Sequence, residues 1–281
     1  MRVLLTGASG MLGTDVAREL ARDDVRAPSH AEADLAEEGA LEQALGEFRP
    51  ELILHCAAYT DVDGCELNPT QAERDNVLAT RNVAALAAKT GSRLVHVSTD
   101  YVFDGAARRP YPVDAPVNPL SVYGRTKLAA EREVEASGAA FLIVRTAWLV
   151  GAHGKNFVEA IRVRARQGAD LEVVDDQRGT PTFTRDLAPA LVALARTRHT
   201  GVLHVTNQGE CTRYEQARAI VELEGFDARV APVSSDKHPR PARRPSYSVL
   251  DNSAANAILG RPLPPWRESL ARYLKETGGA A

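Results

Sequence analysis

Residues 1–13 read MRVLLTGASGMLG and join a short apolar run directly to three glycines, Gly7, Gly10 and Gly13. The apolar run predicts a buried strand, and residues 14–21 predict a helix. Glycine permits a tight turn, close approach of the backbone to a pyrophosphate and close packing of helix on strand, while a helix N-terminus offers free N–H groups. The stretch therefore predicts a dinucleotide-binding turn. Its G-x-x-G-x-x-G spacing differs from the commonest G-x-G-x-x-G fingerprint, and a turn without a ligand is the alternative.

The chain that follows alternates strand-like and helix-like segments. Apolar runs lie at 52–56, 94–98 and 141–146, and the intervening stretch 72–89 is rich in Ala and Leu. Such alternation predicts a parallel sheet covered by helices, with ligands bound at the carboxyl ends of the strands. We expect an α/β fold, a Rossmann-type doubly wound parallel sheet, in which residues 1–150 form the NAD(P)-binding domain.

The pattern loosens after Gly151. Shorter strand candidates lie at 171–174 and 202–205, and residues 237–245 are rich in Pro and Arg. We expect residues 151–281 to form mainly a smaller substrate-binding region. The two later strands could also return to the first sheet, so the boundary near Gly151 is approximate.

Composition excludes several classes of protein. The chain has 281 residues, 44% of them hydrophobic, and a net charge of -3. It lacks the basic excess of a nucleic-acid-binding protein and any apolar run of ~20 residues that could span a membrane. The first strand begins too early to leave room for a signal peptide, so we expect a cytoplasmic protein. Cys56, Cys65 and Cys211 show no CxxC pairing, so neither a disulfide framework nor a zinc site is expected.

The second strand bears on the choice of cofactor. Residues 24–27 form a short strand candidate that is followed by Pro28, Ser29 and His30, none of them acidic. NAD-binding enzymes usually place a carboxylate at this position, whereas a 2′-phosphate favours a cation. Arg26 and His30 could reach a phosphate, which favours NADPH and leaves NADH open; a solvated surface arginine is the alternative. Asp34 and Leu35 are expected on the adenine side, although Asp34 could instead cap a helix.

A phenol and an ammonium stand four residues apart where another helix is expected to begin. At this spacing Tyr123 and Lys127 share a helix face. A nearby cation favours the phenolate, so Lys127 would lower the pKa of Tyr123 toward neutrality and make it a candidate general acid. Thr99, at the end of the fourth strand, can donate a hydrogen bond to a substrate carbonyl oxygen. A tuned acid and such a donor are what hydride addition to a ketone requires.

Longer motifs carry a resemblance to a known family. They are STDYVFDG at 98–105, NPLSVYGRTK at 118–127, RTAW at 145–148, DQRGTPT at 176–182 and RP at 244–245. Together with the glycine turn, they resemble the dTDP-4-dehydrorhamnose reductase family of the extended short-chain dehydrogenase/reductase superfamily. The resemblance implies reduction of the C4 ketone of a dTDP-linked deoxy sugar, most simply dTDP-4-dehydro-L-rhamnose, with NADPH as the hydride donor.

The resemblance also implies roles for individual residues. Thr99, Tyr123 and Lys127 would form the catalytic set, and Lys127 would also hold the nicotinamide ribose. Asp100 and Trp148 would contact the sugar, and the nucleotide part would be bound by Asn156, Arg178, Thr180 and Arg244. Trp148 could alternatively be a core-packing residue and Arg178 a surface charge, whereas ligand contact is favoured for Arg244. The full set of expected cofactor contacts is Gly7, Gly10, Met11, Leu12, Gly13, His30, Asp34, Leu35, Cys56, Ala57, Ala58, Tyr59, Ser98, Tyr123 and Lys127.

No metal site is expected. His96 lies inside an apolar strand and His153 in a glycine-flanked loop, and no spaced carboxylate or second histidine accompanies either. Some members of the family are metal-linked dimers that use acidic side chains near the segments matching 183–186 and 266–268. These segments here read FTRD and WRE, which departs from that acidic pattern. A monomer or a homodimer therefore remains open.

Two other functional classes remain. The same fold serves other nucleotide-sugar ketoreductases, epimerases and dehydratases, although a dehydratase usually has an acidic pair beside the threonine and Asp100 is only one acid. A regulatory subunit of methionine adenosyltransferase also resembles this family, so a non-catalytic NADP-binding protein is the other alternative. The exact sugar and the stereochemistry of the product depend on which ring face meets the nicotinamide.

Overall fold

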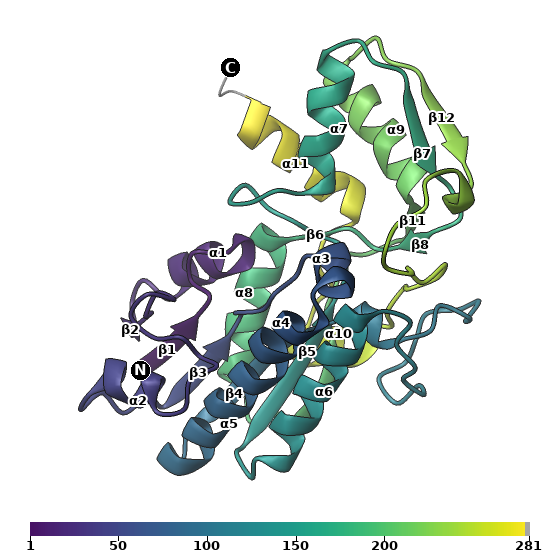
Figure 1. The fold of residues 1–281 in the computed structure, drawn as a ribbon. Coiled ribbons are helices and arrows are strands. Elements are labelled where there is room, and N and C mark those ends of the chain that lie inside the picture. Colours follow the sequence, from purple (N-terminus) through teal and green to yellow (C-terminus); the bar gives the residue numbers. More distant parts are fainter. Residues whose placement is uncertain (279–281) are drawn as a thin grey trace.

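The computed structural model describes residues 1–278, and its centre is a six-stranded sheet (Figure 1). The strand order is β10-β5-β4-β3-β1-β2, and all neighbouring strands run parallel. A doubly wound α/β sheet was predicted, and the prediction is confirmed. The strands are β1 (Arg2–Thr6), β2 (Asp24–Arg26), β3 (Leu52–His55), β4 (Arg93–Thr99), β5 (Phe141–Thr146) and β10 (Gly201–His204).

Helices cover both faces of this sheet, so its central strands are mostly apolar and buried. On one face α1 packs against α8, and their apolar side chains share a core with Val3 and Leu5. On the other face α5 and α6 pack over Leu4, Ile53 and Ile143. The helices of this part are α1 (Met11–Glu19), α2 (Ala40–Leu45), α3 (Val62–Leu67), α4 (Pro69–Glu73), α5 (Ala79–Thr90), α6 (Val122–Ala136), α8 (Thr184–Ala195) and α10 (Ser253–Leu259).

A second, smaller layer lies beyond the carboxyl ends of these strands, at the top of Figure 1. It contains helices and short strand pairs around its own apolar core. Its elements are β6 (Leu149–Val150), α7 (Phe157–Arg166), β7 (Leu171–Val174), β8 (Arg178–Gly179), β9 (Thr182–Phe183), β11 (Cys211–Thr212), α9 (Arg213–Glu224), β12 (Val230–Val233) and α11 (Trp266–Gly278). Short 3-10 turns lie at Asp100–Val102 and Ser235–Lys237.

The two later strand candidates have different positions. The strand β10 joins the edge of the main sheet beside β5, whereas β7 pairs only with β12. The alternative that residues 171–174 return to the first sheet was wrong. Leu171 and Val173 are buried while Glu172 is exposed, so one face of β7 packs against the core and the other faces solvent. This pattern is typical of a strand pair that is covered on one side only.

Within residues 1–278, none of the helices is long and apolar enough to cross a membrane. The parallel strands all end at one edge, so Thr6, Thr99 and Thr146 approach the same crevice below the smaller layer. In an open α/β sheet this edge is where ligands bind. The fold therefore directs the search for a site to the gap between the two layers.

Candidate functional site

The turn after β1 brings two backbone segments so close that side chains are excluded. Gly7 has a φ of 72°, and a Cβ on it would lie 2.6 Å from the backbone nitrogen of Ala57. A Cβ on Gly13 would lie 1.9 Å from the carbonyl oxygen of Gly7. The N-cap of α1 is Gly10, which offers no side chain to the first amides, and no acidic residue lies in the first turn. This helix terminus fits the pyrophosphate of a dinucleotide, because free amides and the helix dipole favour an anion.

A cavity of about 250 Å³ lies on the other side of the Ala57 segment. Six of the residues predicted to contact a cofactor line it, together with Ala36, Asp75 and Ala79: these six are His30, Asp34, Leu35, Ala57, Ala58 and Tyr59. Ala57 lies against the glycine turn, and both Ala57 and Ala58 line this cavity. The arrangement fits the adenosine half of a dinucleotide. The other predicted cofactor residues on neighbouring strands, Cys56 and Ser98, lie at the ends of β3 and β4.

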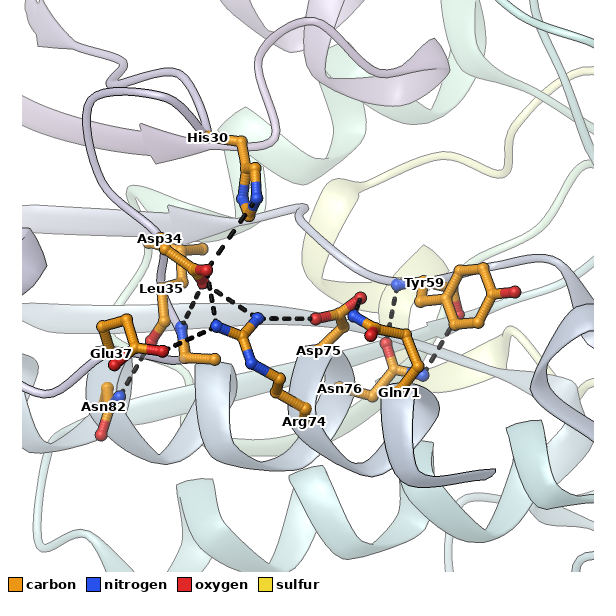
Figure 2. A network of polar contacts seen from close by, with 11 residues as sticks. His30, Asp34, Leu35, Glu37, Tyr59, Gln71, Arg74, Asp75, Asn76 and Asn82 are labelled. Carbon is orange, nitrogen blue, oxygen red and sulfur yellow. Dashed lines mark hydrogen bonds and ion pairs between the residues drawn. The ribbon is translucent and has the colours of Figure 1, made fainter. Parts of the chain in front are cut away.

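Asp34 is held by an arginine that the sequence did not reveal (Figure 2). Its Oδ2 accepts a hydrogen bond of 2.6 Å from Nη2 of Arg74, which also binds Glu37 at 2.7 Å. The Arg74 hydrogen bond lowers the pKa of Asp34 below its ordinary value. The helix-cap alternative for Asp34 was wrong, because its Oδ1 accepts the Ala36 amide at 3.1 Å and α2 begins only at Ala40. The ion pair offsets the charge of this carboxylate beside the cavity.

Arg26 and His30 are not arranged as a preformed phosphate-binding site. The guanidinium of Arg26 stacks over the ring of Phe48 at 5.5 Å. His30 is exposed, and its Nε2 lies 3.9 Å from Oδ2 of Asp34. His30 therefore stands at the mouth of the cavity, while Arg26 is held away from it by stacking.

A buried asparagine ties the cofactor side to the helix that carries Tyr123. Its Oδ1 accepts the Tyr59 amide at 2.8 Å, and Nδ2 of Asn76 donates to Tyr59 O at 3.1 Å and to Thr126 Oγ1 at 3.0 Å. A π-helical turn at Arg74–Leu78 interrupts the helical stretch here. The run 72–89 gave no sign of this turn, because its composition is that of an ordinary helix.

The three predicted catalytic residues converge at the carboxyl edge of the sheet. Thr99 ends β4, and Tyr123 and Lys127 lie one turn apart near the start of α6. The helix begins there because the Ser121 hydroxyl caps the Gly124 amide at 3.2 Å. All three side chains are buried. Thr99 Oγ1 donates to Asp100 Oδ1 at 3.0 Å, which orients the hydroxyl at the end of the strand.

The direction of the Tyr123 pKa shift contradicts the sequence analysis. Burial raises the pKa of the phenol above its ordinary value, and hydrogen bonding with Thr99 offsets only part of this. The Lys127 ammonium donates to the Val97 carbonyl at 2.8 Å, and burial lowers its own pKa to about 8. The expected lowering was wrong because the phenol is buried, and its loss of water outweighs the hydrogen bond with Thr99. Tyr123 is thus a proton-bearing phenol at neutral pH.

Asp100 is a buried carboxyl next to this set. Burial raises its pKa to about 6, although hydrogen bonds with Ser248 and Thr99 act in the opposite direction. Ser248 is itself buried and comes from the chain before α10. The region after residue 238 therefore reaches back to the end of β4 and helps to enclose the site.

A cavity of about 1020 Å³ lies in the smaller layer. Its cationic lining includes Arg213, Lys237, Arg240 and Arg244, and Phe157 supplies an aromatic wall. Arg244 was predicted as a ligand of the nucleotide part and does line this cavity. Its guanidinium binds Asp63 of α3 through two hydrogen bonds of 3.0 Å, so the arginine is oriented from the opposite layer.

Trp148 is clamped between two residues. Its φ is 46°, the one positive value among non-glycine residues of the described chain. A Cβ on Gly179 would lie 2.5 Å from the indole ring, and the Arg213 guanidinium lies 3.5 Å from the ring centroid. The Arg213 side chain makes no ion pair with any residue of 1–278, and its hydrogen bond of 3.2 Å goes to the neutral Gln216. It therefore presents a weakly compensated charge to the cavity.

Three other predicted substrate residues have structural partners instead. Asn156 caps α7 by accepting the Glu159 amide at 3.1 Å. Arg178 pairs with Glu210 and Glu215 at 3.4 and 3.5 Å. Thr180 donates to the Gly209 carbonyl at 2.9 Å. As far as the described residues go, none of the three predicted ligands lines the cavity of Arg213 and Arg244. The sequence gave no indication of this, because asparagine, arginine and threonine side chains can serve as helix caps, ion-pair partners or ligands.

The remaining candidate reactive groups are isolated. In the described part of the chain, no three His, Cys, Asp or Glu side chains form a group that could hold a metal ion. Cys56, Cys65 and Cys211 are free, and burial raises the pKa of each thiol to about 12. These thiols are protonated at neutral pH and are not activated nucleophiles.

Known proteins match nearly the full length of this chain. A family model described as RmlD substrate binding domain matches residues 1–278. A dTDP-4-dehydrorhamnose reductase of Mycobacterium tuberculosis is 44% identical over 283 residues, covering 97% of this chain and 92% of the relative. A dTDP-4-keto-6-deoxy-D-glucose reductase of Streptomyces niveus is 41% identical over 276 residues, covering 96% of each. The crystal structure of a Bacillus anthracis dTDP-4-dehydrorhamnose reductase in complex with NADP superposes with a TM-score of 0.94 at 35% identity, covering 98% of this chain and 99% of that one.

Proposed function

Because this chain belongs to the RmlD substrate binding domain family, we propose that it uses NADPH to reduce dTDP-4-dehydro-L-rhamnose to dTDP-L-rhamnose. One observation carries the proposal: Thr99, Tyr123 and Lys127 meet at the carboxyl edge of the sheet, between the glycine turn and the cationic cavity. Relatives with the same activity in their names and an NADP complex among the similar structures support it.

The cofactor would lie across the edge of the sheet. The amides at the start of α1 would hold the pyrophosphate, and the cavity of His30, Asp34 and Tyr59 would hold the adenosine half. NADPH, when bound, supplies a hydride to the ketone carbon. The Asp34 carboxylate is already paired with Arg74, so it is less available to bind ribose hydroxyls than a free acid would be, which is in keeping with NADPH.

The protein's own groups would complete the addition. As the carbonyl carbon gains a hydride, its oxygen becomes an alkoxide, which takes a proton from the Tyr123 hydroxyl. The Thr99 hydroxyl, which donates to Asp100 in the ligand-free protein, would turn to donate its one hydrogen to the same oxygen, and Lys127 would stabilise the phenolate that remains. Protonated Tyr123 has the correct state for this role, and its burial excludes competing water.

The dTDP part would enter the cavity of the smaller layer. Arg213 and Arg244 supply two guanidinium groups for the diphosphate, and Phe157 offers a face for the base. Asp100, which is hydrogen-bonded to Thr99, and Trp148, which stacks on Arg213 of this cavity, would contact the sugar. Asn156, Arg178 and Thr180 are left out of this assignment.

A related 4-keto sugar is the second candidate substrate. The Streptomyces niveus relative is named for dTDP-4-keto-6-deoxy-D-glucose, and it is nearly as similar to this chain as the mycobacterial one. The same catalytic set would reduce either ketone. We further propose a cytoplasmic enzyme, in keeping with the free cysteines, that acts as a monomer or a homodimer.

The test follows oxidation of NADPH and of NADH by absorbance, with the two ketosugars generated enzymatically in situ. We expect rapid oxidation that depends on dTDP-4-dehydro-L-rhamnose and is faster with NADPH. A preference for dTDP-4-keto-6-deoxy-D-glucose would move the assignment to the second candidate. Cofactor binding without oxidation by either sugar would contradict the reductase and favour a regulatory, NADP-binding protein.

A further inference from the structure

The surroundings of the Lys127 ammonium are unusual for a buried cation. Its Nζ donates to the Val97 carbonyl at 2.8 Å and lies 3.2 Å from Nε2 of His96. No carboxylate of residues 1–278 forms an ion pair with it, since Glu131, one turn along α6, is bound by Arg145 at 2.7 and 2.9 Å. The lysine is therefore held by one backbone carbonyl and one imidazole.

His96 is held by packing and by Lys127, since its Nδ1 has no hydrogen-bond partner among the described residues. It lies in the middle of β4, fully buried, and its ring centroid stands 5.1 Å from that of His55. His55 is in turn held by Thr6 Oγ1 at 2.6 Å and by Thr80 Oγ1 at 3.0 Å. Burial and the nearby ammonium keep the pKa of His96 well below its ordinary value, so the ring is neutral.

The chemistry of the two groups fixes the direction of their hydrogen bond. An ammonium has three donors and no acceptor, so the neutral His96 ring must accept through the Nε2 lone pair and carry its proton on Nδ1. A neutral acceptor can orient a charged donor without the strong pull of a carboxylate. The charged amine is thereby kept on the face of α6 that it shares with Tyr123.

We propose that His96 is a positioning residue for the reduction: its Nε2 and the Val97 carbonyl together orient the Lys127 ammonium toward Tyr123 and the cofactor. The inference deepens the proposed reductase function and rests on it. No other residue of 1–278 accepts a side-chain hydrogen bond from this ammonium, so the loss of His96 leaves a buried donor unsatisfied.

The other groups around Lys127 cannot replace this acceptor. From β3 and the turn after it come His55, whose nitrogens are engaged by threonines, and Cys56, a protonated thiol. From α6 come Tyr123, a protonated phenol, and Glu131, which is committed to Arg145. Removing the His96 lone pair therefore disfavours the charged form of Lys127.

The test compares His96→Leu with His96→Gln. Leucine removes the acceptor, whereas the glutamine amide oxygen can stand close to the position of Nε2. His204→Leu serves as the matched control, because His204 is also fully buried in a strand of the main sheet but binds Tyr111 and Arg145 instead. Melting temperatures of all three variants report any general loss of stability.

The first measurement is an NMR titration of carbon-13-labelled lysine in the ligand-free protein, which is tractable with five lysines, Lys89, Lys127, Lys155, Lys237 and Lys275. We expect the Lys127 midpoint to move about one pH unit lower in His96→Leu, the size of one lost hydrogen bond to a charged group, and to return toward wild type in His96→Gln. His204→Leu should leave it unchanged. An unchanged midpoint in a folded His96→Leu protein would overturn the proposal.

The second measurement is the pH dependence of kcat. Activity should fall as Lys127 loses its proton, so the alkaline limb should lie about one pH unit lower in His96→Leu and return in His96→Gln. An alkaline limb at the same pH in wild type and in His96→Leu would contradict the positioning role. If wild type itself turns over no sugar, the reductase proposal fails, while the lysine titration still decides whether His96 holds Lys127.

Discussion

Asp63 and Arg244 are joined by two parallel hydrogen bonds of 3.0 Å, from Nη1 to Oδ1 and from Nη2 to Oδ2. Asp63 belongs to α3 of the nucleotide-binding layer, and Arg244 belongs to the segment that lines the cavity of the other layer. Burial raises the pKa of Asp63, but the bonds from Arg244 and from the Ala242 amide outweigh this and lower it overall. Asp63 and Arg244 thus form an ion pair that joins the two layers across the proposed site, and we refer to this ion pair as the clasp.

A double-mutant cycle should measure this clasp. Asp63→Asn and Arg244→Gln, singly and together, should give a coupling of about 1 kcal/mol in urea unfolding, because both side chains are mostly buried and the geometry is bidentate. The Arg81–Glu133 pair is a control with similar geometry but a more exposed arginine, and its coupling should be smaller. Purely additive effects at Asp63 and Arg244 would show that the clasp contributes no stability.

Tyr123→Phe should lower kcat by roughly 10²-fold or more and leave NADPH binding nearly intact, because it removes the proposed proton donor and keeps the ring. Lys127→Ala should lower kcat and also weaken NADPH binding, since the lysine is proposed to hold the nicotinamide ribose. Tyr111→Phe is the control, since its hydroxyl binds Asp104 away from Tyr123 and should affect stability alone. Steady-state kinetics and fluorescence titration with NADPH give the two readouts, and retained turnover in Tyr123→Phe would exclude it as the acid.

Asp100→Asn should stabilise the protein at neutral pH while impairing turnover. Burial raises the folded-state pKa of Asp100 from 3.8 to about 6, above the unfolded value. As pH rises through this window the unfolded chain loses its proton first, so stability falls, by roughly 3 kcal/mol when the window is passed. The gain from asparagine should therefore be larger at pH 7.5 than at pH 4.5 in urea unfolding.

Asp104→Asn provides a control of opposite sign. Hydrogen bonds from the Ala106 amide and from Tyr111 lower the pKa of Asp104, so its charged form stabilises the fold above the unfolded pKa. Asp104→Asn should therefore destabilise the protein at pH 7.5, and this effect should disappear as the pH falls. A stability gain at Asp100 that did not vary with pH would show that burial of its charge is not the cause.

Arg213→Met should weaken binding of dTDP by roughly 10-fold to 100-fold, the loss expected for hydrogen bonds to a charged group. Arg213 lines the cavity and has no carboxylate partner within residues 1–278, so its charge is free to bind an anion. Arg218→Met, on the same helix α9 but outside this cavity, should bind dTDP as wild type does. Isothermal titration calorimetry compares them, and equal affinities would place the diphosphate elsewhere.

The sequence alone determined the features that follow from local pattern. Three glycines after an apolar run identified the turn at Gly7, since no other residue tolerates its positive φ and the contact with Ala57. Apolar runs separated by helical stretches identified the parallel sheet, and parallel strands must end at one edge. Thr99 and Tyr123 could therefore be placed in one crevice from their positions in the chain.

Tertiary structure alone decided what depends on burial and on distant partners. The pKa of Tyr123 rises because the phenol is removed from water, and the four-residue spacing to Lys127 carries no information about burial. Asp63 reaches the site because Arg244 returns to α3, and Arg213 because α9 packs against Trp148, whereas Arg178 pairs with Glu210 and Glu215. Local periodicity fixes which face a side chain occupies, but only packing decides which charges meet and how much water they keep.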